Sequence, residues 1–488
     1  MADTVARRTW GRGTIAGAVA TGWSTILVQG IGILRTIVLA RLLFPDLFGI
    51  IALADVFLLV GRQCQDFNFE AGVITRRERL PETMAAHLFL RMSFAVGVGG
   101  VLAVVALLLH HWYDPRVGFV LLWYVGGSLV QAVGSTPRAL LEREFRLTSI
   151  AYVNVGSAVI RTVIPLALVW RGFGLISLVA VNVLDMVVPA IGYWWCRPPV
   201  SYEKFAWEDV RWLLRFGAPI WLAGFLSNVF VLDNFLVGTL CGVEAVGLYA
   251  LAFTLARLPV QVIAHAVTKG AFPAYSVHQG DPLKAGRLFT LAYTAVVWGL
   301  VPLAVLAALL APEVVQLTVG AKWVPMIPAF RWLCVFTVLR GVQDLTVDFF
   351  VSQGKAVWFR NVLALEAVAL LLVGPLAAWR GGPVGMAIAV DVMLCVGVPY
   401  LVGHLRQLVS LKYRTVWVLP LMASVTATVV IGIAASWLQT WPMAWRLVIE
   451  LLIGLAAVLG VWGTFGRAQW RQVQTGIRNL WEGRGTLA

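Results

Sequence analysis

The sequence predicts an all-α membrane protein. Of its 488 residues, 60% are hydrophobic and 13% are charged, whereas soluble domains average about 45–50% apolar and about 25% charged residues. The apolar residues form long runs, and a bilayer-spanning helix needs about 20 of them. Strands of an outer-membrane barrel are a poor alternative, because they alternate over only about 10 residues.

Fourteen apolar segments are separated by charged or Pro/Gly-rich breaks, and each is interpreted as one membrane-spanning helix. In chain order they lie at 14–40, 46–62, 84–109, 117–139, 147–170, 174–196, 214–240, 243–268, 287–311, 325–350, 358–379, 383–404, 415–438 and 444–466. About fourteen spans leave little of the chain for a soluble catalytic domain.

The basic residues predict the orientation. Of the 38 Lys and Arg residues, 26 fall in the alternate loops and tails that would share a side with the N-terminus, and 6 fall in the remaining loops. Basic residues gather on the cytoplasmic side of membrane proteins, so we expect both termini in the cytoplasm. The net charge of +14 then reflects orientation, and we expect no nucleic-acid partner.

A short internal repeat relates the two halves. A shift of 198 residues lays Phe48–Phe57 over Val246–Leu255, matching the Gly and the Ala-Leu-Ala. Both copies enter from the same side, which predicts two parallel, pseudo-symmetric six-helix lobes plus two C-terminal helices. The expected parts are an N-terminal lobe at 1–196, a cytoplasmic linker with a surface helix at 197–213, a C-terminal lobe at 214–404, and spans 13 and 14 with a basic tail at 405–488.

Polar residues inside the predicted spans gather in a few helices. A charge at the bilayer centre costs about 2.5–3.5 kcal/mol on insertion scales, so each one needs a partner, a cavity or a function. Spans 1, 2, 7 and 8 begin the two lobes and can face one another across the axis, which predicts a polar, partly cationic cavity between the lobes. The candidates are Gln29 and Arg35 in span 1, Asp55 in span 2, Asn228, Asp233 and Asn234 in span 7, Arg257, Gln261 and His265 in span 8, and Arg340 in span 10.

Several of these positions have a structural alternative. Arg340 precedes Asp344 by four residues, so an ion pair within the helix competes with a substrate role. His265 could be a helix-contact residue or a proton carrier. The remaining intramembrane charges are interpreted as interhelical hydrogen bonds for Arg161, Asp185, Glu366 and Asp391, and as an interfacial pair for Arg446 and Glu450.

No cofactor signal appears. The five cysteines are scattered without a CxxC pair, the histidines have no third ligand at zinc-binding spacing, and no Walker A sequence is present. We therefore expect no cofactor, no metal site and no ATP-driven transport by this chain alone.

The segment Ala-Arg-Leu-Leu-Phe-Pro-Asp-Leu-Phe-Gly-Ile-Ile-Ala-Leu-Ala-Asp-Val-Phe at 40–57 resembles the signature of the polysaccharide transporter family. This family includes the Wzx-like branch of the multidrug/oligosaccharidyl-lipid/polysaccharide flippase superfamily. The patterns at Phe67–Ile74 and Leu140–Phe145 also match. The resemblance implies fourteen spans in two lobes around a cavity lined mainly by spans 1, 2, 7 and 8.

The resemblance also implies a function. Such proteins move undecaprenyl-pyrophosphate-linked oligosaccharide units to the outer leaflet of the bacterial plasma (inner) membrane for lipopolysaccharide, capsule or exopolysaccharide assembly, alongside polymerases and glycosyltransferases. Arginine suits the pyrophosphate, so Arg35 and Arg257 are the first candidates, with Arg340 behind them. Sugar hydroxyls would contact Gln29, Asn228, Asn234 and Gln261, and a coupling proton or cation would bind Asp55, Asp233 or His265.

Other functions stay open. An exporter of lipid II or of cationic drugs in the same superfamily would have the same span pattern. The polar stripe of span 8, formed by Arg257, Gln261, His265 and Lys269 at four-residue spacing, argues against cationic drugs. A membrane-embedded polymerase or ligase commonly uses a long outer loop, and the predicted outer loops are short. We therefore expect a transporter and no enzyme.

Overall fold

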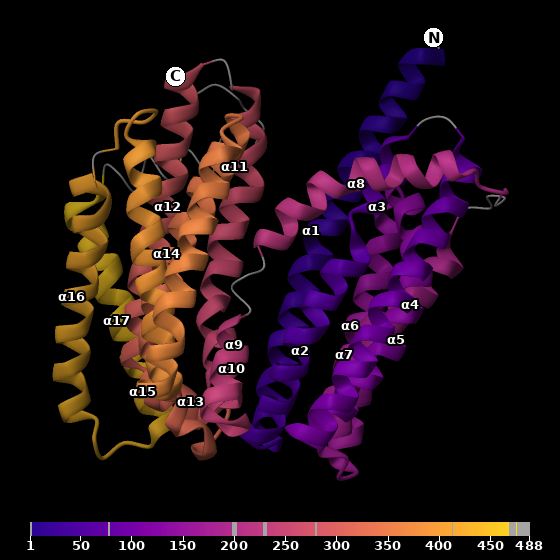
Figure 1. Ribbon diagram of the computed structural model, residues 1–488. Coiled ribbons are helices and arrows are strands. Elements are labelled where there is room, and N and C mark those ends of the chain that lie inside the picture. The colour runs from indigo at the N-terminus through magenta and orange to yellow at the C-terminus, as the bar shows by residue number, and fades with distance from the viewer. Residues whose placement is uncertain are drawn as a thin grey trace. The chain divides into compact units, whose positions relative to one another are not determined.

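The computed structural model describes residues 2–76, 79–197, 203–227, 232–278, 281–411, 413–467 and 475. Every regular element in these ranges is a helix (Figure 1). Eleven of the described helices are long and apolar enough to cross a membrane. The all-α membrane fold is therefore confirmed, while the exact number of fourteen spans stays a prediction.

The chain forms two compact units, Met1–Phe235 and Leu236–Ala488. The division falls inside the short helix α9 (Leu232–Cys241). The predicted boundaries of the lobes and the linker are based on membrane topology, whereas the two units are defined by contacts between residues. The predicted boundaries therefore stay a prediction. Each unit is described by itself.

Unit 1 is a bundle of long antiparallel hairpins joined by short turns. Helix α4 packs on α5, and α7 packs on both α5 and α6, while α6 also contacts α1. Short connections favour antiparallel neighbours because the chain must turn back at once. The helices are α1 (Ala2–Leu42), α2 (Pro45–Asp66), α3 (Phe69–Thr75), α4 (Leu80–Trp112), α5 (Pro115–Arg143), α6 (Leu147–Trp170), α7 (Gly174–Cys196) and α8 (Trp207–Ser227).

The turn between α4 and α5 shows how the sequence sets helix ends. Pro115 occupies the first turn of α5, where its missing N–H costs nothing. Asp114 caps the helix by accepting a hydrogen bond from the backbone N–H of Arg116 at 2.8 Å. Burial alone would raise the pKa of Asp114, but the hydrogen bonds from Arg116 outweigh it and hold that pKa below its usual value.

Helix α8 crosses the bundle instead of running along it (Figure 1). Its apolar residues Val210 and Leu213 join a buried cluster with Phe69 of α3 and Leu90 of α4. The indole N–H of Trp221 donates to the carbonyl of Gln63 at 2.7 Å. The helix that begins in the predicted linker is therefore docked on unit 1.

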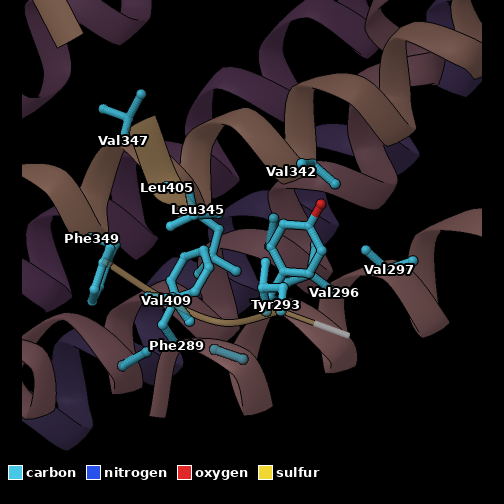
Figure 2. Close-up of a cluster of buried hydrophobic side chains, with 14 of the residues drawn as sticks. Phe289, Tyr293, Val296, Val297, Val342, Leu345, Val347, Phe349, Leu405 and Val409 are labelled. Atoms are coloured by element: carbon cyan, nitrogen blue, oxygen red, sulfur yellow. The ribbon is translucent and has the colours of Figure 1, made fainter. Parts of the chain in front are cut away.

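Unit 2 is built around one large apolar core. Phe289 and Tyr293 of α12 meet Leu345 and Phe349 of α14 in this core (Figure 2). The helices and turns are α10 (Val243–Pro259), the π-helical segment η2 (Val260–Ala264), α11 (His265–Val277), α12 (Pro282–Leu309), α13 (Ala311–Thr318), the 3₁₀ turn η3 (Ala321–Met326), α14 (Ile327–Ser352), α15 (Ala356–Leu405), α16 (Tyr413–Trp437) and α17 (Met443–Phe465).

Three of the predicted segments explain why length and hydropathy identify eleven spans and not fourteen. The segment 214–240 is divided between α8 and the short helix α9, and neither is among the eleven. Helix α14 carries Arg331, Arg340, Asp344 and Asp348, and it is not among the eleven. Helix α15 has 50 residues with a break at Gly382, whose φ of 56° lies in the left-handed region that favours glycine. Two of the predicted segments therefore fall in the single element α15.

The last helix, α17, is attached to the rest of unit 2 by an ion cluster and an aromatic pair. Arg446 of α17 contacts Glu450 at 2.9 Å and Glu313 of α13 at 2.9 Å. Trp298 of α12 stacks on Trp462 of α17 with ring centroids 5.4 Å apart. The expected Arg446–Glu450 pair is confirmed, and Glu313 is a partner that the sequence did not indicate.

Candidate functional site

The structure distributes the predicted site residues over both units. Unit 1 holds Gln29 and Arg35 in α1, Asp55 in α2, and Asp233 and Asn234 in α9. Unit 2 holds Arg257 in α10, Gln261 in η2, His265 at the start of α11, and Arg340 in α14. Asn228 lies outside the described residues. Their joint role as one substrate site stays a prediction.

The π-helical segment η2 lies inside the polar stripe of span 8. An α-helix turns about 100° per residue, so residues eight apart point about 80° apart. A π-bulge inserts one extra residue without rotating the turns on either side of it. Arg257 and His265 are therefore oriented like residues seven apart in a regular α-helix, whose side-chain directions differ by about 20°. Pro259 lies directly before the bulge, where it has no N–H to donate to the regular helix ladder. The stripe is therefore straighter than its four-residue spacing predicts.

Asp55 belongs to a hydrogen-bonded group that joins three helices of unit 1. Asn182 of α7 donates from its amide nitrogen to a carboxylate oxygen of Asp55 at 3.0 Å. The same amide contacts the hydroxyl of Tyr124 in α5, and Tyr124 is hydrogen-bonded to Asp55 in turn. Arg62, about two turns further along α2, interacts electrostatically with Asp55.

A second polar group lies one turn along α7 from Asn182. Asp185 accepts a hydrogen bond from Arg161 of α6. Arg35 of α1 interacts electrostatically with both Arg161 and Asp185. The expected interhelical hydrogen bonds of Arg161 and Asp185 are confirmed, and the two residues are each other's partners. Arg35 is brought to the same group, which the sequence did not indicate.

These groups adjoin a polar cavity of about 430 Å³ inside unit 1. Its walls come from the C-terminal parts of α2, α5 and α7, the N-terminal parts of α4 and α6, and the short helix α3. Gly134 of α5 lies against Ala190 of α7, where an added Cβ would approach the Cβ of Ala190 to 2.4 Å. The polar lining consists of Arg62, Gln63, Gln65, Asp66, Glu70, Arg91, Gln131, Ser135, Arg138, Asn154, Asp185 and Tyr193.

The cavity lining is balanced in charge, with three arginines and three carboxylates. Arg91 donates to the carbonyl of Gln65 at 2.9 Å, to Asp66 at 3.0 Å and to Ser135 at 3.1 Å. The side chains of Asp66 and Arg138, near the C-terminal ends of α2 and α5, are 53% and 47% exposed. Charged groups that are exposed within a membrane bundle line water-filled cavities. The cavity is therefore suited to water and to polar solutes.

Unit 2 contains one half-buried ion pair and one buried polar pair. Arg340 contacts Asp344 at 2.8 Å, so the ion pair within the helix is confirmed. Gln343 donates to both oxygens of Glu366 in α15, at 2.8 and 3.0 Å, which confirms an interhelical hydrogen bond for Glu366. Gly397 lies beside this carboxylate, since an added Cβ would approach an Oε atom of Glu366 to 1.9 Å.

Hairpin register could have identified both interhelical pairs. Arg161 lies 11 residues before Gly172 in the α6–α7 turn, and Asp185 lies 13 residues after it. Residues at similar distances from a short turn lie side by side in an antiparallel hairpin. Gln343 and Glu366 are likewise 11 and 12 residues from Gly354 in the α14–α15 turn. By contrast, the cavity depends on six helices, and no local pattern reports it.

Metal binding has no structural support in the described part of the chain. There, no group of three His, Cys, Asp or Glu residues could hold a metal ion. The described histidines have other surroundings. His87, for example, is buried and bonded to Thr136 at 2.8 Å.

Comparison with known proteins places the chain among polysaccharide biosynthesis proteins. Residues 38–328 match a family model described as "Polysaccharide biosynthesis protein". The chain is 26% identical over 345 residues to the lipopolysaccharide biosynthesis protein WzxC of Escherichia coli K12, covering 68% of each chain. It is 22% identical to the succinoglycan biosynthesis transport protein ExoT of Rhizobium meliloti, over 72% of this chain and 73% of that one.

Solved structures support the fold. The lipid II flippase MurJ in an inward closed conformation superposes with a TM-score of 0.72 at 13% identity, covering 93% of this chain and 99% of that one. An inward-facing multidrug resistance MATE family transporter of the MOP superfamily superposes with a TM-score of 0.54 at 19% identity, covering 79% and 94%. At these identities the likeness shows a shared helical fold.

Proposed function

Because the chain belongs to the family of polysaccharide biosynthesis proteins, we propose that it is a flippase for lipid-linked oligosaccharides. It would move undecaprenyl-pyrophosphate-linked units across the bacterial plasma membrane for exopolysaccharide, capsule or lipopolysaccharide assembly. The polar cavity of unit 1 carries this proposal among the structural features. A cavity of about 430 Å³ with charged walls, inside a bundle of apolar helices, gives a polar head group a hydrated environment within the membrane.

The chemistry of the cavity suits a sugar better than a cationic drug. Sugar hydroxyls both donate and accept hydrogen bonds, and the lining offers arginine donors, carboxylate acceptors and amides that do both. A cavity selective for cations would carry an excess of carboxylates, and this one carries equal numbers of arginines and carboxylates. Because the charges balance, neutral polar groups would be held by hydrogen bonds.

Transport would proceed by alternating access, with the polar site opening first to one side of the membrane and then to the other. The basic residues of the loops support a plasma-membrane location with both termini in the cytoplasm. The cavity then opens at the cytoplasmic ends of its helices, where glycosyltransferases assemble lipid-linked units. Its product would be delivered to a polysaccharide polymerase on the outer side.

Ion coupling belongs to the same proposal. Asp55 is held by Asn182, and Asp233 is buried and accepts from the backbone N–H of Asn234. Either carboxylate could bind a coupling proton or cation. His265 is exposed, and it would act only as a proton carrier from solvent.

Gene deletion tests the function in the native host. We expect the deletion strain to lose the surface glycan and to accumulate lipid-linked units in the inner leaflet. The intact gene should restore export. Unchanged export in the deletion strain would contradict the proposal. Rescue of cells depleted of their lipid II flippase would instead assign the chain to lipid II.

A further inference from the structure

Four arginines of unit 1 have a buried hydrogen-bond donor without an acceptor. Arg76 lies after the short helix α3, and the other three lie within the long helices α1, α2 and α6. In the described part of the chain, no hydrogen-bond partner is present for Nη1 of Arg35, Nε of Arg62 or Nε of Arg161. A buried N–H without an acceptor costs about 1–3 kcal/mol, and more when the group is charged. Three such groups in one bundle therefore indicate that an acceptor joins them during function.

The charges around two of these arginines do not balance. Arg35 and Arg161 interact with each other and with a single carboxylate, that of Asp185. Asp185 already accepts from Nη1 of Arg161, so it cannot neutralise both guanidinium groups. Two cations that share one anion in a bundle of apolar helices carry an excess positive charge, which a bound anion would remove.

The cavity reaches this group at Asp185. Asp185 contributes to the lining, and its side chain is 39% exposed. Arg62 lines the same cavity. On α7, Asn182 and Asp185 are three residues apart and share a face, so α7 connects the Asp55 group near Arg62 with the Arg161 group.

We propose that Arg35 and Arg161, which both interact with Asp185, bind a phosphate oxyanion beside this carboxylate at the edge of the cavity, with Arg62 on the cavity wall. The planar guanidinium group matches the geometry of phosphate oxygens and can donate two parallel hydrogen bonds. A diphosphate offers enough oxygens for donors from α1, α2 and α6 at once. The proposal adds Arg62 and Arg161 to the residues expected from the sequence. The proposal rests on the proposed function only where it identifies the carrier of the diphosphate as a lipid.

Direct binding tests the site without transport. The full chain would be purified in detergent and titrated calorimetrically with inorganic diphosphate, with a polyprenyl diphosphate and with phosphatidylglycerol. We expect the first two to bind and phosphatidylglycerol to bind weakly, because its single diester phosphate has fewer free oxygens. Binding of inorganic diphosphate alone would place the site on free anions. Equal binding of glucuronate would overturn the phosphate assignment.

The variants separate binding from structure. Arg35→Gln and Arg161→Gln should each weaken diphosphate binding about tenfold or more, the usual effect of losing a charge-assisted hydrogen bond. Asp185→Asn removes the carboxylate that competes with the ligand, so it should bind diphosphate at least as tightly as the parent. Arg446→Gln, which breaks an ion pair in unit 2, is the control and should bind like the parent.

Two results would overturn the inference. One is parental binding by both Arg35→Gln and Arg161→Gln. The other is an equal loss of binding in Arg161→Gln and Asp185→Asn, which would show that the pair only supports the fold. If Arg161→Gln does not fold, Arg161→Lys keeps the positive charge but lacks the planar guanidinium group, and it should bind diphosphate with intermediate affinity. These binding measurements do not involve transport. A negative result would therefore contradict the diphosphate site without changing the result expected from the gene deletion.

Discussion

Several charged side chains in the described part of the chain are paired with a partner on the same helix or on the neighbouring helix of a hairpin. The pairs four residues apart, Arg340–Asp344 and Arg446–Glu450, could be predicted because helix geometry places such residues side by side. Arg161 and Asp185 could be predicted to form interhelical bonds, but not to bond each other. Their pairing depends on the register of the helix hairpin, which can be predicted by counting residues from the turn.

The Gln343–Glu366 pair gives a prediction at the residue scale. Both side chains are almost fully buried, and Gln343 donates to both carboxylate oxygens. Gln343→Leu would leave the carboxylate without these donors. We expect a loss of about 1–3 kcal/mol in the free energy of unfolding, measured as a lower Tm of the purified protein in detergent. Gln407→Leu, at an exposed position, is the control, and a parental Tm for Gln343→Leu would contradict the account.

Single elements depart from regular geometry where polar residues must be aligned. The sequence indicates the stripe from Arg257 to His265 through its spacing, but not the π-helical segment η2 that straightens it. A bulge is hard to predict because its cost is offset by tertiary packing instead of by local propensity. Pro259, directly before the bulge, is the one local signal.

Deleting one residue tests the function of the bulge. Removing Val262 from η2 should give a regular α-helix whose flanking turns keep their orientation, so export should persist. Removing Ala266 from α11 should rotate the rest of that helix by about 100° and abolish export. Surface glycan and protein level in the membrane would be measured together. Equal export by the two deletion variants would contradict a role for the bulge in alignment.

Helix α8 gives a second prediction for an element. Its Asp209 is fully buried, contacts Arg76 at 2.9 Å and Arg79 at 3.3 Å, and accepts from the backbone N–H of Ala206 at 3.1 Å. Asp209→Asn should lower the free energy of unfolding by about 2–3 kcal/mol, because it removes the buried negative charge that both arginines contact. Glu208→Gln is the matched control, since Glu208 is 79% exposed and should change stability by less than about 0.5 kcal/mol. Equal Tm values for the two variants would show that the ion cluster does not hold α8.

The fold class of the whole molecule could be predicted from hydropathy alone, because apolar runs of this length have no other stable arrangement in a membrane. The number of spans could not be settled in the same way. Helix α14 carries four charges that lower its hydropathy, and α15 is continuous except at Gly382. Such helices are recognised by their packing and not by their composition.

Orientation is the prediction that belongs to the whole chain. Single cysteines would be introduced at Arg171, in the α6–α7 turn, and at Glu144, in the α5–α6 turn, after replacement of the five natural cysteines. The distribution of basic residues predicts that Arg171→Cys is labelled by a membrane-impermeant maleimide in intact cells. Glu144→Cys should be labelled only after permeabilisation. The reverse pattern would contradict the predicted orientation.

The central claim is that this chain moves a lipid-linked diphosphate sugar across the bilayer. The most direct measurement follows a polyprenyl-diphosphate-linked disaccharide in proteoliposomes, by its accessibility to a glycosidase added outside. Without the protein, about half of the lipid should be cleaved, because the two leaflets exchange such lipids very slowly. With the protein, cleavage should proceed towards completion, and Arg161→Gln should slow it. Cleavage that stops at the same level with and without the protein would contradict the account.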